Sequence, residues 1–341
     1  MSKPKLTVGI PTRNRSRLVT SLVHACLRQT EPIFEIVVSD NASDDDTIAR
    51  LAEFNHPSLI VIRQAENIGM VGNWNACLKS SSGDWFVLLS DDDQVDADFH
   101  EHAQRAIDSH RSADLLIMRC RIRDHISNQI NINPPPITTS GQVDFLRDIF
   151  PAWLRHEFTM PLAGFIFRAE MLKSSAGFSN LVPFAADVAT WLPIACLNNC
   201  AFWPEAKIDY VVHAGMTTRT FDFEALIIDL LAIHMLIVTT IDECATTAES
   251  RNYFRGLANV NLKLGFRNML IISARKGAGK FYLLSTWIKY ASRIPDHGIS
   301  FPSLVAVVVP ACMFNIVGWP YRTWLAFKRR PTKYETMATS L

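Results

Sequence analysis

The chain has 341 residues, of which 48% are hydrophobic and 20% are charged, a composition that fits one large or two modest folded domains and excludes a disordered or fibrous chain. The net charge of +1 hides an asymmetry: residues 251–341 carry 14 basic and 2 acidic side chains, whereas residues 1–250 carry 20 basic and 31 acidic ones. This division predicts two regions that face different partners.

Seven cysteines are scattered along the chain without a C-x-x-C pair, and Cys196 and Cys200 lack the partners that a zinc site needs. Free thiols are typical of a reducing compartment. The first ten residues, MSKPKLTVGI, contain no long apolar stretch, so no signal peptide is evident. We therefore expect the first region to be cytoplasmic.

The first 100 residues predict alternating strands and helices. Strands are expected at 6–10, 34–39, 59–63 and 85–89, with helices at 17–30, 44–54 and 71–81. Ser43 or Asp44 is expected to cap the second helix. Strands rich in Val, Ile and Leu that alternate with helices indicate a parallel sheet covered on both faces, so the fold class is α/β.

Each of these strands ends in polar residues. The four ends are Thr12-Arg13-Asn14, Asp40-Asn41, Glu66-Asn67 and Asp91-Asp92-Asp93. Because ligands of parallel sheets bind beyond the carboxyl ends of the strands, the four ends are expected to meet at one binding edge.

Asp91–Asp93 follow the apolar strand Trp85–Leu89 almost directly. Adjacent carboxylates repel one another, and burying them costs several kcal/mol unless a cation compensates. A solvated loop is the alternative interpretation of an acidic triplet. At the binding edge of such a sheet, hard oxygen ligands suit Mg²⁺ or Mn²⁺, which also contacts substrate phosphates. The sequence therefore predicts a metal ion that carries a diphosphate.

Three segments together resemble a known family. LTVGIPTRNRSRLVTSLVHACLRQT, FEIVVSDNASDDDT and ENIGMVGNWNACLKSSSGDWFVLLSDDD are similar, in order and spacing, to the inverting family 2 glycosyltransferases. The resemblance covers about residues 5–215 and is to bacterial surface-polysaccharide enzymes of the abequosyl- or rhamnosyltransferase kind. It implies the A-type fold, a Rossmann-like and mostly parallel sheet flanked by helices.

The resemblance also implies an activity and a domain division. The activity is metal-dependent, inverting transfer of a sugar from a nucleotide-sugar donor to a saccharide or lipid-linked acceptor in O-antigen- or capsule-like polysaccharide synthesis. Residues 1–220 are expected to form the catalytic domain, with donor binding in 1–100 and the acceptor side in 101–220. Residues 221–341 are expected to form a helical region associated with a membrane.

Several positions match the family's donor and metal sites. The donor positions are Pro11, Thr12 and Arg13 for the base and diphosphate, Asp40 for the base, Asn67 and Gly69 of the N-x-G turn, and Asn75 further along the same helix. Taken singly, each is also compatible with an ordinary turn or helix cap.

Ser90 stands where many relatives have another Asp, so the resemblance alone does not say which of the adjacent carboxylates matches the family's metal ligand. We favour Asp92 and Asp93 on the metal side, with Asp91 toward the ribose or sugar. His213, in DYVVHAG, matches the family's late His near the diphosphate and metal. A structural His after an apolar strand is the alternative.

On the acceptor side, Asp187 precedes the apolar run VATWLPIACL and matches the family's catalytic base. An inverting transfer needs one base to take the proton from the acceptor hydroxyl. A simple helix cap is the alternative role.

Two other function classes are considered. A sugar nucleotidyltransferase is disfavoured, because GIPTRNRS lacks the glycine pattern expected after its first strand. A non-catalytic nucleotide-sugar binder or membrane scaffold would not need a base at Asp187.

The last third of the chain differs in character. Residues 224–241 predict an apolar packing helix, and residues 299–320 carry no charge but contain Pro302 and Pro310. Basic residues interleaved with aromatic ones favour an interfacial segment on the inner face of an anionic membrane. A solvated basic face is the alternative, and nothing here resembles a nucleic-acid-binding motif.

Residues 251–341 should therefore bind the protein to anionic liposomes. Each basic residue near the surface contributes about 1 kcal/mol that salt weakens, and the apolar run 299–320 adds a salt-resistant component. In liposome sedimentation, full-length protein should pellet and be released only in part by high salt, whereas a truncation before Ile299 should bind more weakly and release fully. Both proteins remaining in the supernatant would contradict this expectation.

Overall fold

The computed structural model describes residues 3–125, 129–132, 137–182, 185–213 and 223–275. The chain divides into two compact units, residues 1–220 and residues 221–341, which are treated separately below. The segment 276–341, which includes the predicted interfacial run 299–320, lies outside the described residues.

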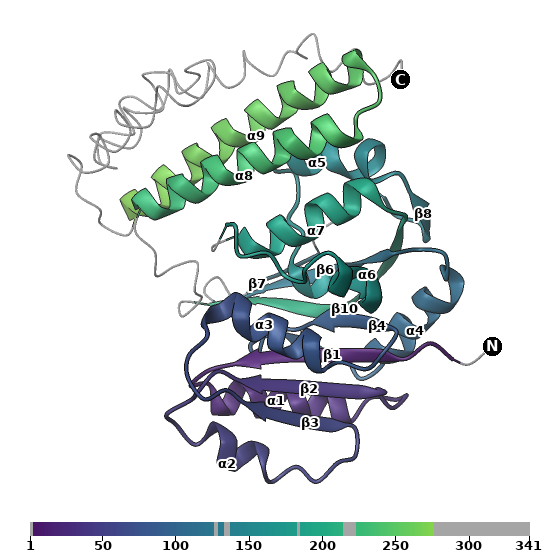
Figure 1. Cartoon of the computed structure of the whole chain (residues 1–341), viewed down its shortest axis with the longest axis vertical. Coiled ribbons are helices and arrows are strands. Elements are labelled where there is room, and N and C mark those ends of the chain that lie inside the picture. The colour runs from purple at the N-terminus through teal and green to yellow at the C-terminus, as the bar shows by residue number, and fades with distance from the viewer. Residues whose placement is uncertain (1–2, 126–128, 133–136, 183–184, 214–222, 276–341) are drawn as a thin grey trace. The chain divides into compact units, whose positions relative to one another are not determined.

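The first unit is built on one mixed sheet (Figure 1). Its strands are β1 (Leu6–Thr12), β2 (Glu35–Asp40), β3 (Leu59–Arg63), β4 (Trp85–Leu88), β5 (Gln94–Val95), β6 (Leu115–Asp124), β7 (Gln129–Ile132), β8 (Gly141–Val143), β9 (Phe165–Arg168) and β10 (Cys200–Val212). The order across the sheet is β3-β2-β1-β4-β9-β6-β10-β5, with β7 beside β6 and β8 beside β10.

Helices flank this sheet on both faces (Figure 1). They are α1 (Ser16–Leu27), α2 (Thr47–Leu51), α3 (Gly69–Ser80), α4 (Phe99–Ser109), α5 (Phe150–Leu154), α6 (Ala169–Ser174) and α7 (Ala186–Leu197), with a π-helical turn η1 (Phe145–Ile149) and a 3₁₀ turn η2 (Leu162–Gly164).

The predicted parallel core of this sheet is confirmed. β1 pairs in parallel with β2 and β4, and β2 pairs in parallel with β3. One difference concerns α2, which begins at Thr47 with Asp46 as its N-cap residue, so neither Ser43 nor Asp44 caps it. Ser43 instead hydrogen-bonds to Asp40 at the end of β2, and residues 44–46 form a bend before α2 begins.

The two faces of β1 have different packing. Leu6, Val8 and Ile10 belong to one buried apolar cluster with residues of α1 and α4. On the other face, a Cβ added at Gly9 would lie 2.5 Å from the Phe86 ring and 3.0 Å from Cβ of Cys77, which is on α3. The bare backbone at Gly9 therefore lets Cys77 of α3 and Phe86 of β4 lie close to β1.

The second half of the sheet is mixed. β9 runs antiparallel to β4 and β6, whereas β6 and β10 are parallel. Asp209 of β10, only 2% exposed, forms ion pairs with Arg121 and Arg123 of β6. Arg121 also bonds to both carboxylate oxygens of Asp96, at 2.6 and 2.9 Å. These ion pairs tie the segment after the acidic triplet to the neighbouring strands.

The second unit contains α8 (Phe223–Cys244) and α9 (Ala248–Arg275) in its described part. The two helices pack together, with Leu230 of α8 filling the space beside Gly265 of α9. Among the described residues, Glu224–Cys244 is the one helix long and apolar enough to cross a membrane. A core helix of a soluble protein passes the same test, so length and composition do not decide its environment.

Candidate active site

Asp91 lies in the loop that follows β4, at the carboxyl ends of the parallel strands. There it faces the end of β1 and the loop that follows β1. Its Oδ2 accepts a hydrogen bond of 2.7 Å from Oγ1 of Thr12, and its Oδ1 lies 2.8 Å from Nη1 of Arg15. The Asp91 side chain is 5% exposed. Burial raises the pKa of Asp91, although the Arg15 charge and both hydrogen bonds oppose this rise.

Asp92 contacts residues from both halves of the sheet. Its Oδ2 lies 2.9 Å from Nη1 of Arg15 and 2.8 Å from Nε2 of His213, which follows β10. His213 is 121 positions away in the sequence and is 23% exposed. The structure thus brings together Asp92 and His213, both predicted to bind the metal, and adds Arg15, which the sequence analysis did not select.

Asp93 has a different environment from its two neighbours. Its Oδ2 accepts a hydrogen bond of 2.9 Å from the backbone N–H of Ser90, which closes a tight turn, and its Oδ1 is buried without a hydrogen-bond partner among the described residues. Burial, reinforced by the charge of Asp92, raises the pKa of Asp93 well above its usual range. Asp93 therefore faces the interior and stabilises the turn of the acidic loop, residues 90–93.

The end of β2 is held by a local network around Asp40. This residue is fully buried, accepts hydrogen bonds from the hydroxyl and the backbone N–H of Ser43, and lies 3.9 Å from Nε of Arg63. Next to it, Asn41 donates to Oδ1 of Asn67 at 2.8 Å. The same Asn67 oxygen accepts from the N–H of Gly69, whose φ of +79° suits glycine. The predicted N-x-G turn thus lies beside the β2 end.

The remaining predicted donor residues lie in different surroundings. Pro11 is a half-buried residue of β1, and Arg13 is exposed in the loop that follows. Asn75 makes two hydrogen bonds to the backbone of Phe178, at 2.8 and 3.0 Å, so its side chain fastens α3 to the segment before α7. The α3 side chain that reaches the strand ends is Asn73, which donates to the Ser39 carbonyl at 2.9 Å.

Asp187 is the second residue of α7, and Ala185 is the N-cap residue, so Asp187 does not have the simple capping role that was considered. Its side chain keeps partial exposure, yet the surrounding protein removes enough water to raise its pKa to about 6. The N–H groups of Val188 and of Asp187 itself oppose this rise. A carboxyl group with such a pKa is suited to accept a proton near neutral pH.

Tyr210 of β10 is buried near several carboxylates. Burial raises the pKa of Tyr210, and the charges of Asp93, Asp187 and Asp92 raise it further. Carboxylates from the loop after β4 and from α7 thus both act electrostatically on this one side chain. Neither Tyr210 nor Arg15 stands in a motif that singles it out, although Arg15 belongs to the PTRNRS loop.

The described residues contain no cluster of three or more His, Cys, Asp or Glu side chains arranged to enclose a metal ion. Asp92 and His213 nevertheless offer a carboxylate oxygen and an imidazole nitrogen at one point. Mg²⁺ and Mn²⁺ are commonly held by one or two carboxylates together with substrate phosphates. This donor set therefore fits a divalent ion.

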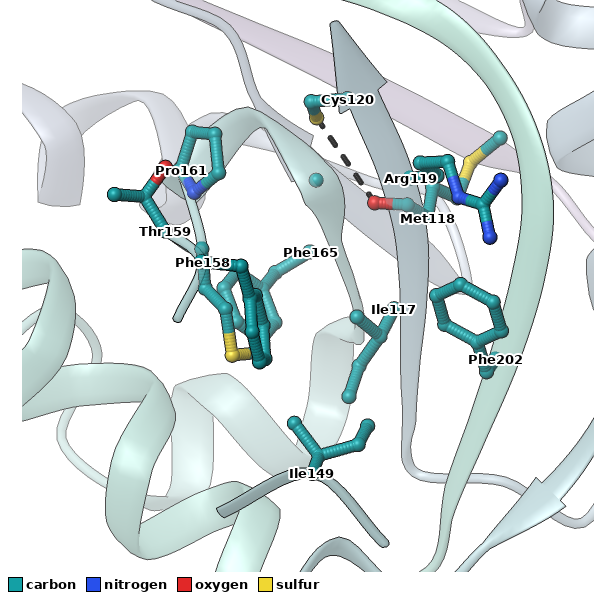
Figure 2. A pocket seen from close by; sticks show the side chains of 12 residues that line it. Ile117, Met118, Arg119, Cys120, Ile149, Phe158, Thr159, Pro161, Phe165 and Phe202 are labelled. Carbon is teal, nitrogen blue, oxygen red and sulfur yellow. Dashed lines mark hydrogen bonds between the residues drawn. The ribbon is translucent and has the colours of Figure 1, made fainter. Parts of the chain in front are cut away.

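A separate apolar pocket lies between β6, β9 and the segment 158–161 (Figure 2). Its volume is about 20 Å³, room for a single water molecule. Cys120 lines this pocket, and its thiol contacts the Met118 carbonyl. The pocket is too small for a sugar, so it is a packing gap between these strands and the segment 158–161.

Comparison with known proteins shows similarity to glycosyltransferases. Residues 7–172 match the family model "Glycosyl transferase family 2". The poly(ribitol-phosphate) beta-N-acetylglucosaminyltransferase TarS of Staphylococcus aureus is 31% identical over 117 residues, 33% of this chain and 20% of that protein. The GalNAc(5)-diNAcBac-PP-undecaprenol beta-1,3-glucosyltransferase of Campylobacter jejuni is 34% identical over 95 residues, 27% of this chain and 31% of that protein.

The fold comparison extends further along the chain. The crystal structure of S. aureus TarS 1–349 in complex with UDP-GlcNAc superimposes with a TM-score of 0.64 at 16% identity, over 89% of each chain. The A-type glycosyltransferase fold predicted from the sequence is therefore confirmed. The match of residues 7–172 to this family model favours a glycosyltransferase over a nucleotidyltransferase or a non-catalytic binder. The chain spans about a fifth of the length of the whole TarS protein.

Replacement of Asp187 by Asn should stabilise the protein at neutral pH. The pKa of Asp187 rises from 3.8 to about 6 on folding, so the charged carboxylate opposes folding above pH 6 and has no such effect below about pH 4. Denaturant unfolding should show Asp187→Asn to be about 1–3 kcal/mol more stable at pH 7.5, a difference that vanishes toward pH 4. An equal difference at both pH values would contradict this explanation.

Proposed function

We propose that this protein is a metal-dependent inverting glycosyltransferase. It moves a sugar from a nucleotide-sugar donor to a saccharide or lipid-linked acceptor during polysaccharide synthesis. The single observation that carries this proposal is the contact of 2.8 Å between Asp92 and His213. Two residues far apart in the sequence meet at the carboxyl edge of the sheet, where ligands of such sheets bind.

Relatives support the classes of substrate. TarS is named as an N-acetylglucosaminyltransferase and has been crystallised with UDP-GlcNAc, and the C. jejuni relative is named as acting on an undecaprenol-linked saccharide. A nucleotide sugar and a lipid-linked saccharide are therefore the substrates proposed here. A lipid-linked acceptor also agrees with the expectation that residues 251–341 attach the enzyme to the inner face of a membrane.

The donor binds over the ends of β1, β2 and β4 in this proposal. Thr12 and Arg13 contact the diphosphate, Asp40 and the turn at Asn67 and Gly69 surround the base, and Asp91 faces the ribose or sugar. For Asp40 to reach a base, its hydrogen bonds to Ser43 must rearrange, because the carboxylate is fully buried. The proposal leaves Asn75 out of the donor site, because its side chain hydrogen-bonds to the backbone of Phe178.

In this proposal Asp92 and His213 would hold the metal ion, and Asp93 would fix the turn that carries Asp92. When bound, Mg²⁺ or Mn²⁺ stabilises negative charge on the leaving diphosphate. His213 lies at the end of β10, a few residues after Tyr210, so the same strand reaches both the metal ligands and the acceptor side. The chain thereby orients the leaving group relative to the base.

Asp187 is the base of the proposed reaction. Its carboxylate takes the proton of the acceptor hydroxyl as the hydroxyl oxygen attacks the anomeric carbon, and the bond to the diphosphate breaks on the opposite side. One base and one displacement give inversion at the anomeric carbon. With a pKa of about 6, Asp187 is mostly ionised at neutral pH yet more basic than an ordinary aspartate.

Asp92→Ala should abolish metal-dependent donor binding and transfer while the protein remains folded. The variant removes a carboxylate that is 14% exposed at the edge of the sheet, so the core is unaffected. A thermal-shift screen of the wild type with UDP, GDP, CDP and dTDP sugars, with and without Mn²⁺, identifies the nucleotide of the donor. The protein is stabilised most by the nucleotide sugar that it binds most tightly. Asp92→Ala should lose that shift, and near wild-type transfer by this variant would refute the metal site.

Asp187→Asn should lower turnover by about 10²-fold or more and leave donor affinity nearly unchanged. The amide keeps the shape of the side chain but cannot accept the proton. In the wild type, kcat should fall below about pH 6 as Asp187 becomes protonated, whereas the residual rate of the variant should lack that step. Retention of the donor's anomeric configuration in the product, read by NMR, would contradict the single-base mechanism.

A further inference from the structure

Arg15 occupies a distinctive position in the acidic site. One nitrogen, Nη1, lies 2.8 Å from Oδ1 of Asp91 and 2.9 Å from Oδ2 of Asp92. The side chain comes from the residue just before α1 and is 29% exposed. A single positively charged nitrogen therefore bridges two adjacent carboxylates that would otherwise repel each other.

This bridging involves the oxygen that the proposed metal ion needs. Oδ2 of Asp92 is the atom that contacts both Arg15 and His213. A divalent cation bound by Asp92 and His213 would have to lie close to this oxygen. The guanidinium and a dication repel each other, and in partly buried surroundings such repulsion is weakly screened.

The burial of Asp91 points the same way. Its side chain is 5% exposed and lies 2.8 Å from the Arg15 guanidinium. Without a cation beside it, the acidic pair would be strained by its own charge. The free protein therefore supplies a cation from its own chain.

We infer that Arg15 is the internal counter-ion of the metal site: it neutralises Asp91 and Asp92 in the free protein, and a divalent cation must displace it from Asp92. This inference rests on the proposed function. Its consequence is that Arg15 weakens the binding of the metal alone. Firm binding then requires further ligands, which the donor diphosphate supplies, so metal and donor bind together.

Metal affinity of the free, full-length protein tests this inference without any donor. Electron paramagnetic resonance of unbound Mn²⁺ gives the affinity for Mn²⁺ alone. Arg15→Gln, which removes the competing charge, should bind Mn²⁺ on the order of tenfold more tightly than the wild type. Arg15→Lys keeps a positive charge and should restore weak binding.

Matched controls separate this effect from a general change in charge. Arg17→Gln removes an exposed charge two residues further on, in the first turn of α1, and should leave Mn²⁺ affinity unchanged. Asp92→Asn should abolish the tight binding of Mn²⁺ in the Arg15→Gln background, which locates the measured ion. Partial unfolding cannot mimic the expected result, because it would weaken binding.

Unchanged or weaker Mn²⁺ binding in Arg15→Gln would overturn the inference. Arg15→Met, which keeps most of the side-chain volume, provides the same test if the Gln variant unfolds in a thermal melt. Sugar transfer by the wild-type enzyme tests the proposed function separately. The counter-ion role can therefore fail while transfer is observed, and a change in Mn²⁺ affinity can be found in the absence of transfer.

Discussion

The structure of the site depends on neutralising carboxylates that a buried strand delivers to the edge of the sheet. Because β4 is apolar and fully buried, the residues that follow it are drawn out of water together with their charges. Arg15 contacts both Asp91 and Asp92, and His213 contacts Asp92. Asp93 has no such partner among the described residues, and burial raises its pKa well above the usual range. These contacts join the loop after β1, the loop after β4 and the end of β10.

Much of this arrangement could be predicted from the sequence, because it follows from local pattern. Apolar runs mark β1 to β4, and polar residues after each run place Thr12, Asp40 and Asp91 at one edge. His213 and Asp187 were selected by family resemblance, and the structure places His213 in contact with Asp92 and Asp187 in the first turn of α7. Their roles in metal binding and proton transfer stay predictions.

The contacts that the sequence did not predict depend on register between distant segments. Arg13 and Arg15 are two residues apart in one loop, and only the direction of the chain entering α1 decides that Arg15 faces Asp91. Likewise, Asn73 and Asn75 lie on the same helix, but the helix turns Asn73 toward the strands and Asn75 toward Phe178. Motif position alone does not resolve such choices, because neighbouring residues of the same type satisfy the same pattern.

The site also shows how one fold gives neighbouring carboxyl groups different properties. Asp92 is 14% exposed at the edge of the sheet, where its carboxylate contacts both Arg15 and His213. The pKa of Asp187 is raised to about 6 by burial at the start of α7, a position at which charge opposes folding. A raised pKa makes Asp187 a better proton acceptor near neutral pH and the folded protein less stable. Greater basicity and lower stability thus have the same physical cause, the removal of water from one carboxylate.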